Sequence, residues 1–125
     1  MSEIYLLQLA SQQAKWLSAR QTMIAANISN ASTPGYRAMD IQPFSDVLDQ
    51  TRVTMVSTNP ADIALDGNDF TAARTTESDP WDATLSGNSV NLEQELTKEG
   101  DTNRSYTLNT NIKRAFHQML LSALK

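Results

Sequence analysis

A seam of mostly apolar positions recurs at alternating steps of three and four through the first thirty residues. Its members are Leu7, Ala10, Ala14, Leu17, Gln21, Ile24 and Ile28. No Gly or Pro interrupts residues 3–29, so the spacing predicts one long helix with an a/d heptad seam. At 1.5 Å per residue, this helix would be roughly 40 Å long. So long a seam is more than a chain of this size can cover by itself.

Trp16 and Met23 add apolar surface outside the seam of this helix. One interpretation is a second core face, covered by another part of the same chain. The other is a contact with another molecule.

The helical pattern ends at a stretch rich in turn residues, Asn27–Tyr36. Pro34 disfavours helical geometry at Thr33, and Gly35 accepts a positive φ, so the pair suits the two central positions of a type II turn. Asn27 and Asn30 are placed to bond backbone groups that the helix end leaves open. We therefore expect a helix stop followed by a tight turn.

The middle of the chain carries weaker signals. Residues 43–50 begin with Pro and place Phe44, Val47 and Leu48 on one face, which predicts a short helix lying on a long one. Beyond it, Val53–Val56 favours a strand, Asn59-Pro60 favours a turn, and Asp66-Gly67 suits a hairpin. Few apolar residues offset the ordering entropy here, so we interpret residues 51–88 as an insert that is mobile or ordered by a partner.

A second long helix is predicted from the cap residue Asn91 towards Lys125, with Gln94 three residues after the cap. Gly100, followed by weak helix formers, is the expected position of a kink. One apolar stripe comprises Tyr106, Leu108, Ile112, Ala115, Met119 and Ala123, and it is widened by Phe116, Leu120 and Leu124. An apolar face of this width needs more than one neighbouring helix.

These elements predict an all-α fold in which the N- and C-terminal helices pair as an antiparallel coiled coil around a mostly irregular middle. The expected division is residues 1–36 for the first helix and turn, 37–50 for a loop and short helix, 51–90 for the insert, and 91–125 for the second helix. Residues 1–36 and 91–125 would form one structural core.

Charge and composition narrow the function. The chain has 125 residues and a formal net charge of -4, and residues 37–90 hold nine acidic and three basic side chains. A segment of that sign is a poor ligand for nucleic acid, which requires clustered Lys and Arg. There is no Cys, no apolar run long enough for a membrane span, and no Sec-type signal at the first residues.

No constellation of catalytic or metal-binding residues emerges. His117 has no ligand partner at a suitable spacing, and Asp66–Asp69 lacks the alternating oxygens of a calcium loop. Glu93 and Glu95 are two residues apart and so point away from one another on a helix. The sequence therefore predicts no enzyme, metal, cofactor or small-molecule substrate.

The stretch Ala25–Ala38 resembles the signature of the axial proteins of the bacterial flagellum, which are the rod, hook and hook-associated subunits. Similar stretches are Asp40–Phe44, Thr58–Pro60 with Ile63, Ser86–Glu93 and Arg104–Tyr106, and they look most like the short proximal rod proteins of the flagellar basal-body rod family. The similarity covers both ends of the chain and thins out over residues 65–84. Asp62 departs from it, because a His is common before Ile63.

The resemblance implies a structural subunit of the basal-body proximal rod, the tubular drive shaft that crosses the periplasm and serves motility. Its partners would be copies of itself, other rod proteins, the rod-to-membrane-ring adaptor and the flagellar type III export apparatus. Export by that route would explain the missing Sec signal. The family motif would comprise Asn27, Asn30, Thr33, Pro34, Gly35 and Tyr36.

The expected assembly interface draws on both long helices. It comprises Leu7, Leu17, Ile24, Ile28, Tyr106, Ile112, Phe116, Met119, Leu120 and Leu124. Of these, Phe116 and Leu120 are expected beside the main stripe, facing neighbouring subunits. The alternative is a secreted helical effector or export chaperone that binds a partner helix, which explains the amphipathic helices but not the Asn27–Tyr36 turn.

Overall fold

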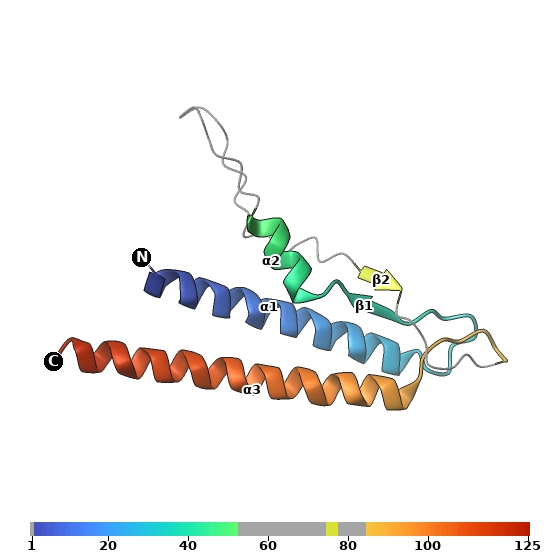
Figure 1. Ribbon diagram of the computed structural model, residues 1–125. Helices are drawn as coiled ribbons and strands as arrows, with labels where there is room; N and C mark the ends of the chain where they lie inside the picture. Colours follow the sequence, from blue (N-terminus) through green and yellow to red (C-terminus); the bar gives the residue numbers. More distant parts are fainter. Residues whose placement is uncertain (1, 53–74, 78–84) are drawn as a thin grey trace, which may run out of the picture.

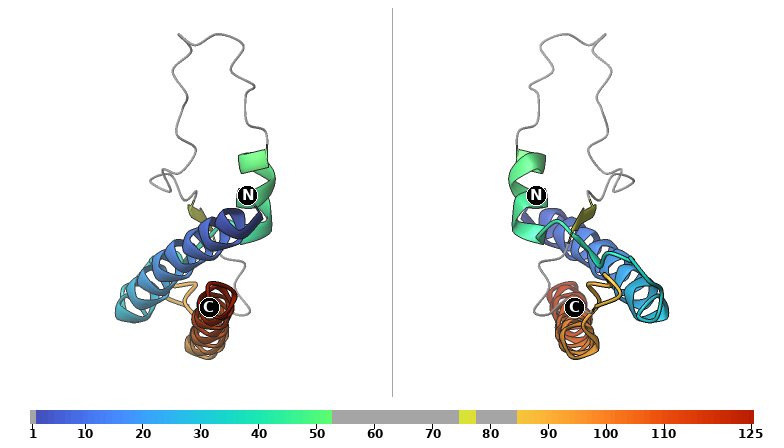
Figure 2. Two further views of the ribbon diagram at one scale, coloured as in Figure 1. Left: turned by 90° about the vertical axis from the view of Figure 1, so that its left-hand side faces the viewer. Right: turned by 90° about the vertical axis from the view of Figure 1, so that its right-hand side faces the viewer.

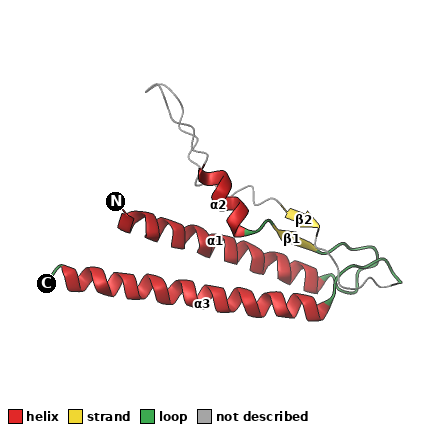
Figure 3. Cartoon of the chain, in the orientation of Figure 1, coloured by secondary structure: helices red, strands yellow, loops and turns green. Residues whose placement is uncertain are grey.

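The computed structural model describes residues 2–52, 75–77 and 85–125. These residues form helices α1 (Ser2–Ser29), α2 (Phe44–Arg52) and α3 (Leu92–Ala123) and strands β1 (Met39–Ile41) and β2 (Thr75–Glu77) (Figure 3). The chain is thus mostly helical, with long helices near both termini, as the hydrophobic spacing predicts. The expected strand at Val53–Val56, turn at Asn59-Pro60 and hairpin at Asp66-Gly67 lie outside the described residues.

The two long helices lie side by side and run in opposite directions, so that the termini lie at the same end (Figure 1). The Asn109 amide donates to the carbonyl of Ala10, near the start of α1. At the other end, the Asn27 amide near the end of α1 donates to Glu95 at the start of α3. The separation of the two helices widens towards the termini in the view of Figure 1, and the end-on views show that they cross at an angle (Figure 2).

The seam predicted for α1 faces the interior at one position per heptad. Ala10, Leu17 and Ile24 are buried, and Leu7, Ala14 and Ile28 are half-buried. Gln21 lies at the edge of the helix pair, where its amide donates to the Glu99 carboxylate at 3.0 Å.

A second apolar face of α1 packs against β1 and α2. Trp16, Leu17 and Ile41 are buried together, and the partly buried residues packed on them are Ala19, Met23, Phe44 and Val47. The Trp16 indole N–H donates to the carbonyl of Gln42 at 2.8 Å, and its ring lies 5.9 Å from that of Phe44. This confirms the core interpretation of Trp16 and Met23. The short helix lies on a long one, as expected for a helix too short to be stable alone.

β1 and β2 form an antiparallel pair in which Met39 lies opposite Glu77 and Ile41 opposite Thr75. A two-stranded ribbon is at best marginally stable in water. Here Ile41 enters the apolar core, and the exposed side chains of Arg37 and Glu77 form an ion pair. Residues 75–77, which the sequence assigns to the insert, are therefore paired with a strand that lies on α1.

The predicted turn and helix cap are confirmed. α1 ends at Ser29, Gly35 has a φ of +73°, and the Tyr36 N–H donates to the carbonyl of Thr33 at 3.3 Å. This is the hydrogen bond expected across a turn with Pro34 and Gly35 at its centre. At the start of α3, the Asn91 side chain accepts from the N–H of Gln94 at 3.1 Å.

α3 runs as one helix through Gly100. The weak helix formers at residues 100–103 therefore do not divide it. A single Gly costs only about 1 kcal/mol relative to Ala in a helix interior, and packing against α1 offsets that cost.

Gly35 and Gly100 have opposite backbone requirements, so we expect substitution by Ala to change the free energy of unfolding in opposite directions at the two positions. Gly35→Ala should lower the free energy of unfolding by about 1 kcal/mol or more, because Ala resists a positive φ. Gly100→Ala should raise it by about 1 kcal/mol, because Gly100 is exposed, helical and has open space at its Cβ position. Urea titration followed by circular dichroism measures both. If both substitutions shifted the free energy of unfolding in the same direction, this account of the turn would be contradicted.

Candidate functional site

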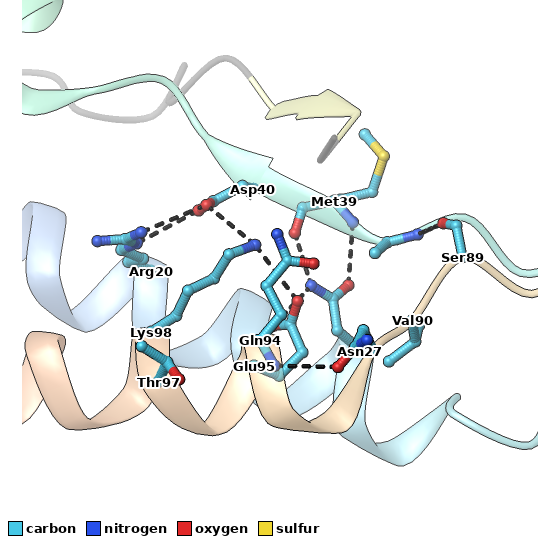
Figure 4. A network of polar contacts seen from close by, with 12 residues as sticks. Arg20, Asn27, Met39, Asp40, Ser89, Val90, Gln94, Glu95, Thr97 and Lys98 are labelled. Atoms are coloured by element: carbon cyan, nitrogen blue, oxygen red, sulfur yellow. Dashed lines mark hydrogen bonds and ion pairs between the residues drawn. The ribbon is translucent and has the colours of Figure 1, made fainter. Parts of the chain in front are cut away.

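The end of α1 and the start of α3 meet at a fully buried amide, that of Asn27, which is 0% exposed (Figure 4). Its Nδ2 donates to the carbonyl of Met39 at 2.7 Å and to Glu95 Oε2 at 3.2 Å. Its Oδ1 accepts from the Met39 N–H at 3.0 Å and from the Tyr36 hydroxyl at 3.3 Å. One side chain thus connects α1, the turn, β1 and α3.

A row of alternating charges continues from Glu95 along the helix pair (Figure 4). Lys98 Nζ lies 3.3 Å from Glu95 Oε1 and 3.4 Å from Asp40 Oδ2, and Arg20 Nε lies 3.4 Å from Asp40 Oδ1. The two acids and two bases neutralise one another, which allows Glu95 to be 1% exposed. The Arg20 guanidinium also lies over the Trp16 ring, 5.4 Å from its centroid, and so links the row to the apolar core.

The Asn88 side chain, also buried, binds the turn that follows α1. Its Nδ2 lies 2.8–2.9 Å from three carbonyl oxygens, those of Asn30, Ala31 and Thr33. These carbonyl groups belong to the turn that follows α1, which ends at Ser29. Asn88 therefore ties this turn to the segment before α3, while its Oδ1 accepts from the Val90 N–H at 2.8 Å.

The segment before α3 also pairs with the turn through its backbone. The Gly35 N–H donates to the carbonyl of Ser86, and the Ser89 N–H donates to that of Tyr36. The Ser89 hydroxyl accepts from the Ala38 N–H at 2.8 Å. Gly87 has a φ of +77°, and a Cβ added to it would lie 3.7 Å from the Gly35 Cα, so two glycines meet at this crossing.

The side chains of the predicted turn residues form hydrogen bonds within the turn and with the end of α1. The Asn30 amide donates to the carbonyl of Ala26 at 2.8 Å, and its Oδ1 accepts from the Thr33 hydroxyl at 3.2 Å. Asn27 and Asn30 therefore both form hydrogen bonds with groups of their own chain. Pro34 and Gly35 are exposed, whereas Tyr36 is half-buried against Asn27.

Several polar residues of this site were not singled out from the sequence: Arg20, Asp40, Asn88, Glu95, Lys98, Thr102 and Asn109. Asn88 lies in the Ser86–Glu93 stretch that carries the resemblance, but nothing local indicates its contacts with the turn. The detectable signal is the seven-residue spacing of Glu95, Thr102 and Asn109, which puts three polar residues on one line of the helix. All three are buried.

The residues expected at the assembly interface fall into three groups. Leu17 and Ile24 are buried within the chain; Leu7, Ile28, Phe116 and Leu120 are half-buried; and Tyr106, Ile112, Met119 and Leu124 are exposed. Phe116 and Leu120 are more covered in the single chain than the main stripe is, and their contact with neighbouring subunits stays a prediction. Phe116 continues the seven-residue line of Glu95 and Asn109, which faces α1, and the main stripe is the more exposed one.

The described residues provide no group of three or more His, Asp or Glu side chains that could hold a metal ion. His117 is exposed on α3. None of the described helices is both long and apolar enough to cross a membrane. The buried carboxylate Glu95 is occupied by Asn27 and Lys98, so the network serves to hold backbone segments together.

A structural class is indicated by the sequence profile described as "Flagella basal body rod protein", which matches residues 9–37. These residues cover most of α1 and the turn that follows it.

Full-length relatives define the family within this class. The flagellar basal body rod protein FlgB of Agrobacterium fabrum (strain C58 / ATCC 33970) is 40% identical, over 100% of this chain and 96% of the relative. The protein of the same name from Escherichia coli (strain K12) is 33% identical over 84% of this chain and 74% of its own length. The protein from Salmonella typhimurium is 32% identical over 71% and 70%. The chain belongs to the FlgB family of flagellar basal-body rod proteins.

This family membership makes the chain a structural component of the flagellar basal-body rod and not an enzyme. It confirms the resemblance to rod proteins and favours the rod subunit over a secreted effector or export chaperone.

The charge row predicts a strong dependence on Lys98. Lys98→Met should lower the free energy of unfolding by about 3 kcal/mol, because it leaves the buried Glu95 carboxylate without its cation. Lys113→Met, at an exposed position of the same helix, is the matched control and should change it by less than about 0.5 kcal/mol. Chemical denaturation of both variants tests this; equal stability would mean that the row contributes nothing to the fold.

The contacts of Asn88 with the turn after α1 predict that an isosteric change is costly. Asn88→Asp replaces two N–H donors by a carboxylate that faces three carbonyl oxygens, so we expect a loss of about 3 kcal/mol in the free energy of unfolding. Asn111→Asp makes the same change at an exposed position of α3 and should be nearly neutral. The two melting curves would coincide if Asn88 did not stabilise the turn.

Proposed function

We propose that the chain is a subunit of the proximal rod that assembles with copies of itself and with other rod proteins into the tubular drive shaft crossing the periplasm. The observation that carries this proposal is an exposed apolar stripe on α3. Its members are Leu108, Ile112 and Met119, which share one side of the helix and are each at least 45% exposed.

This outer stripe is an unusual surface for an isolated helix pair. Leu108 and Met119 are both 61% exposed, and full burial of one such side chain is worth about 1.5 to 3 kcal/mol. Several contacts of this size on each subunit, repeated in an assembly, offset the entropy lost when each copy is fixed in place. The stripe therefore supports packing of α3 against helices of neighbouring subunits.

Within the subunit, we propose that α1 and α3 form the antiparallel coiled-coil core given by residues 1–36 and 91–125. Residues 37–50 would form the loop and short helix on its side, and residues 51–90 would form the insert, of which residues 75–77 pair with β1 and residues 86–90 with the turn. The exposed members of the expected interface, Tyr106, Ile112, Met119 and Leu124, would contact neighbours. Leu17 and Ile24 would act indirectly, by holding the hairpin together.

Membership of the FlgB family also supports two finer proposals about partners and location. One is contact with the adaptor that joins the rod to a membrane ring. The other is passage through the flagellar type III export apparatus to the periplasmic rod.

The outer stripe predicts that a change in it affects assembly into the rod but not export. The double change Leu108→Gln and Met119→Gln should leave secretion and the free energy of unfolding nearly unchanged, because both side chains are exposed in the single chain. Incorporation into basal bodies should fall by about tenfold or more, since apolar burial is lost at two contacts per subunit. Quantifying the chain in culture supernatants and in purified basal bodies measures both effects.

Asn111→Gln is the control, because it places the same side chain at an exposed polar position of α3. It should be secreted and incorporated normally. Normal incorporation of the Leu108 and Met119 double variant would remove the outer stripe from the assembly interface.

A further inference from the structure

α3 turns its polar side, and not its most apolar side, towards α1. Glu95, Thr102 and Asn109 are spaced by seven residues and are 1%, 2% and 4% exposed. The buried residues of the α1 seam, Ala10, Leu17 and Ile24, are apolar and have the same spacing. The contacts of Asn109 with Ala10 and of Glu95 with Asn27 place the two lines against each other in antiparallel order.

Hydrophobic burial alone would not choose this orientation. Rotating α3 about its axis would bury the outer stripe and expose Glu95 and Asn109, which is the arrangement that apolar transfer energies favour. Specific polar contacts must therefore outweigh that preference in the single chain.

Those contacts exist in one register of the two helices. Asn109 Nδ2 donates to the carbonyl of Ala10 at 3.1 Å and to Gln13 Oε1 at 2.7 Å. A slip of one heptad would move Asn109 opposite either Leu17 or the first turn of α1, and would separate Glu95 from Asn27. A buried polar group that loses its partner is strongly disfavoured.

We propose that Glu95 and Asn109 are specificity-determining residues, which select α1 in a single register as the partner of the inner side of α3. They also exclude the inner side of α3 from a second copy, because two such surfaces would bring carboxylates and amides together without the groups that satisfy them in α1. Intermolecular packing is thereby directed to the outer stripe. This inference concerns the single chain and holds whether or not the outer stripe acts in the rod.

A competing explanation is that the closed end of the hairpin sets the register by itself. Asn88 and the backbone pairing of residues 86–90 with the turn tie the start of α3 to the end of α1. The experiment must therefore change the inner side of α3 while leaving this clamp intact.

Engineered disulfides report the register directly, since the chain contains no Cys. Gln21 and Glu99 are hydrogen-bonded across the edge of the pair, so Gln21→Cys with Glu99→Cys traps the native register. Leu92 and Tyr106 lie one heptad to either side of Glu99 and are both exposed. Gln21→Cys combined with Leu92→Cys or with Tyr106→Cys traps a slipped register, and Glu99→Cys alone traps inner-side contacts between two copies.

We expect Asn109→Leu, and more strongly Asn109→Leu with Glu95→Met, to raise the slipped and intermolecular disulfide products by about tenfold relative to the parent chain. Asn111→Leu makes the same change at an exposed position and should leave the products unchanged. Non-reducing gel electrophoresis after mild oxidation of dilute protein gives the fractions, and circular dichroism reports helicity.

Two outcomes would overturn the proposal. If the double variant formed only the native disulfide, the closed-end clamp would be sufficient to set register and partner. If Asn109→Leu lost its helicity, Asn109 would be required for stability and not for selection.

Discussion

The buried amide of Asn27 is the constraint on which the rest of the structure depends. A polar side chain without access to water is tolerated only when its donors and acceptors are satisfied. Satisfying Asn27 requires Met39, Tyr36 and Glu95 to stand at fixed positions around it. The exit of α1, the start of β1 and the entry of α3 are therefore determined together, and hydrophobic contacts alone would not define them so narrowly.

The polar network and the apolar core have separate roles. Trp16, Leu17 and Ile41 bury the side of α1 that meets β1 and α2 and provide apolar burial. The row from Glu95 to Arg20 lies between α1, β1 and α3 and sets their mutual orientation. Because a buried ion pair adds little net stability, the main effect of the row is to orient α1, β1 and α3 relative to one another.

A subunit that must both hold its own shape and bind neighbours needs two distinguishable surfaces on its long helices. In α3 the distinction is chemical: the inner side is polar and is matched by α1, and the outer stripe is apolar and exposed. The separation of the helices also widens towards the termini in the view of Figure 1. Apolar residues such as Met119 therefore remain accessible at the end of the hairpin opposite to the clamp.

The sequence by itself determined the local elements: the helix stop and turn at Pro34-Gly35, the cap at Asn91 and the short helix beginning at Phe44. Each follows from backbone and side-chain preferences that act within a few residues. Only the tertiary structure decided which side of α3 faces α1, and it leaves the main stripe more exposed than Phe116. Hydrophobic spacing shows where a helix is apolar. The side that is buried depends on partners such as Gln13 and Asn27, which lie far away in the sequence and satisfy polar groups that a helical pattern alone assigns to solvent.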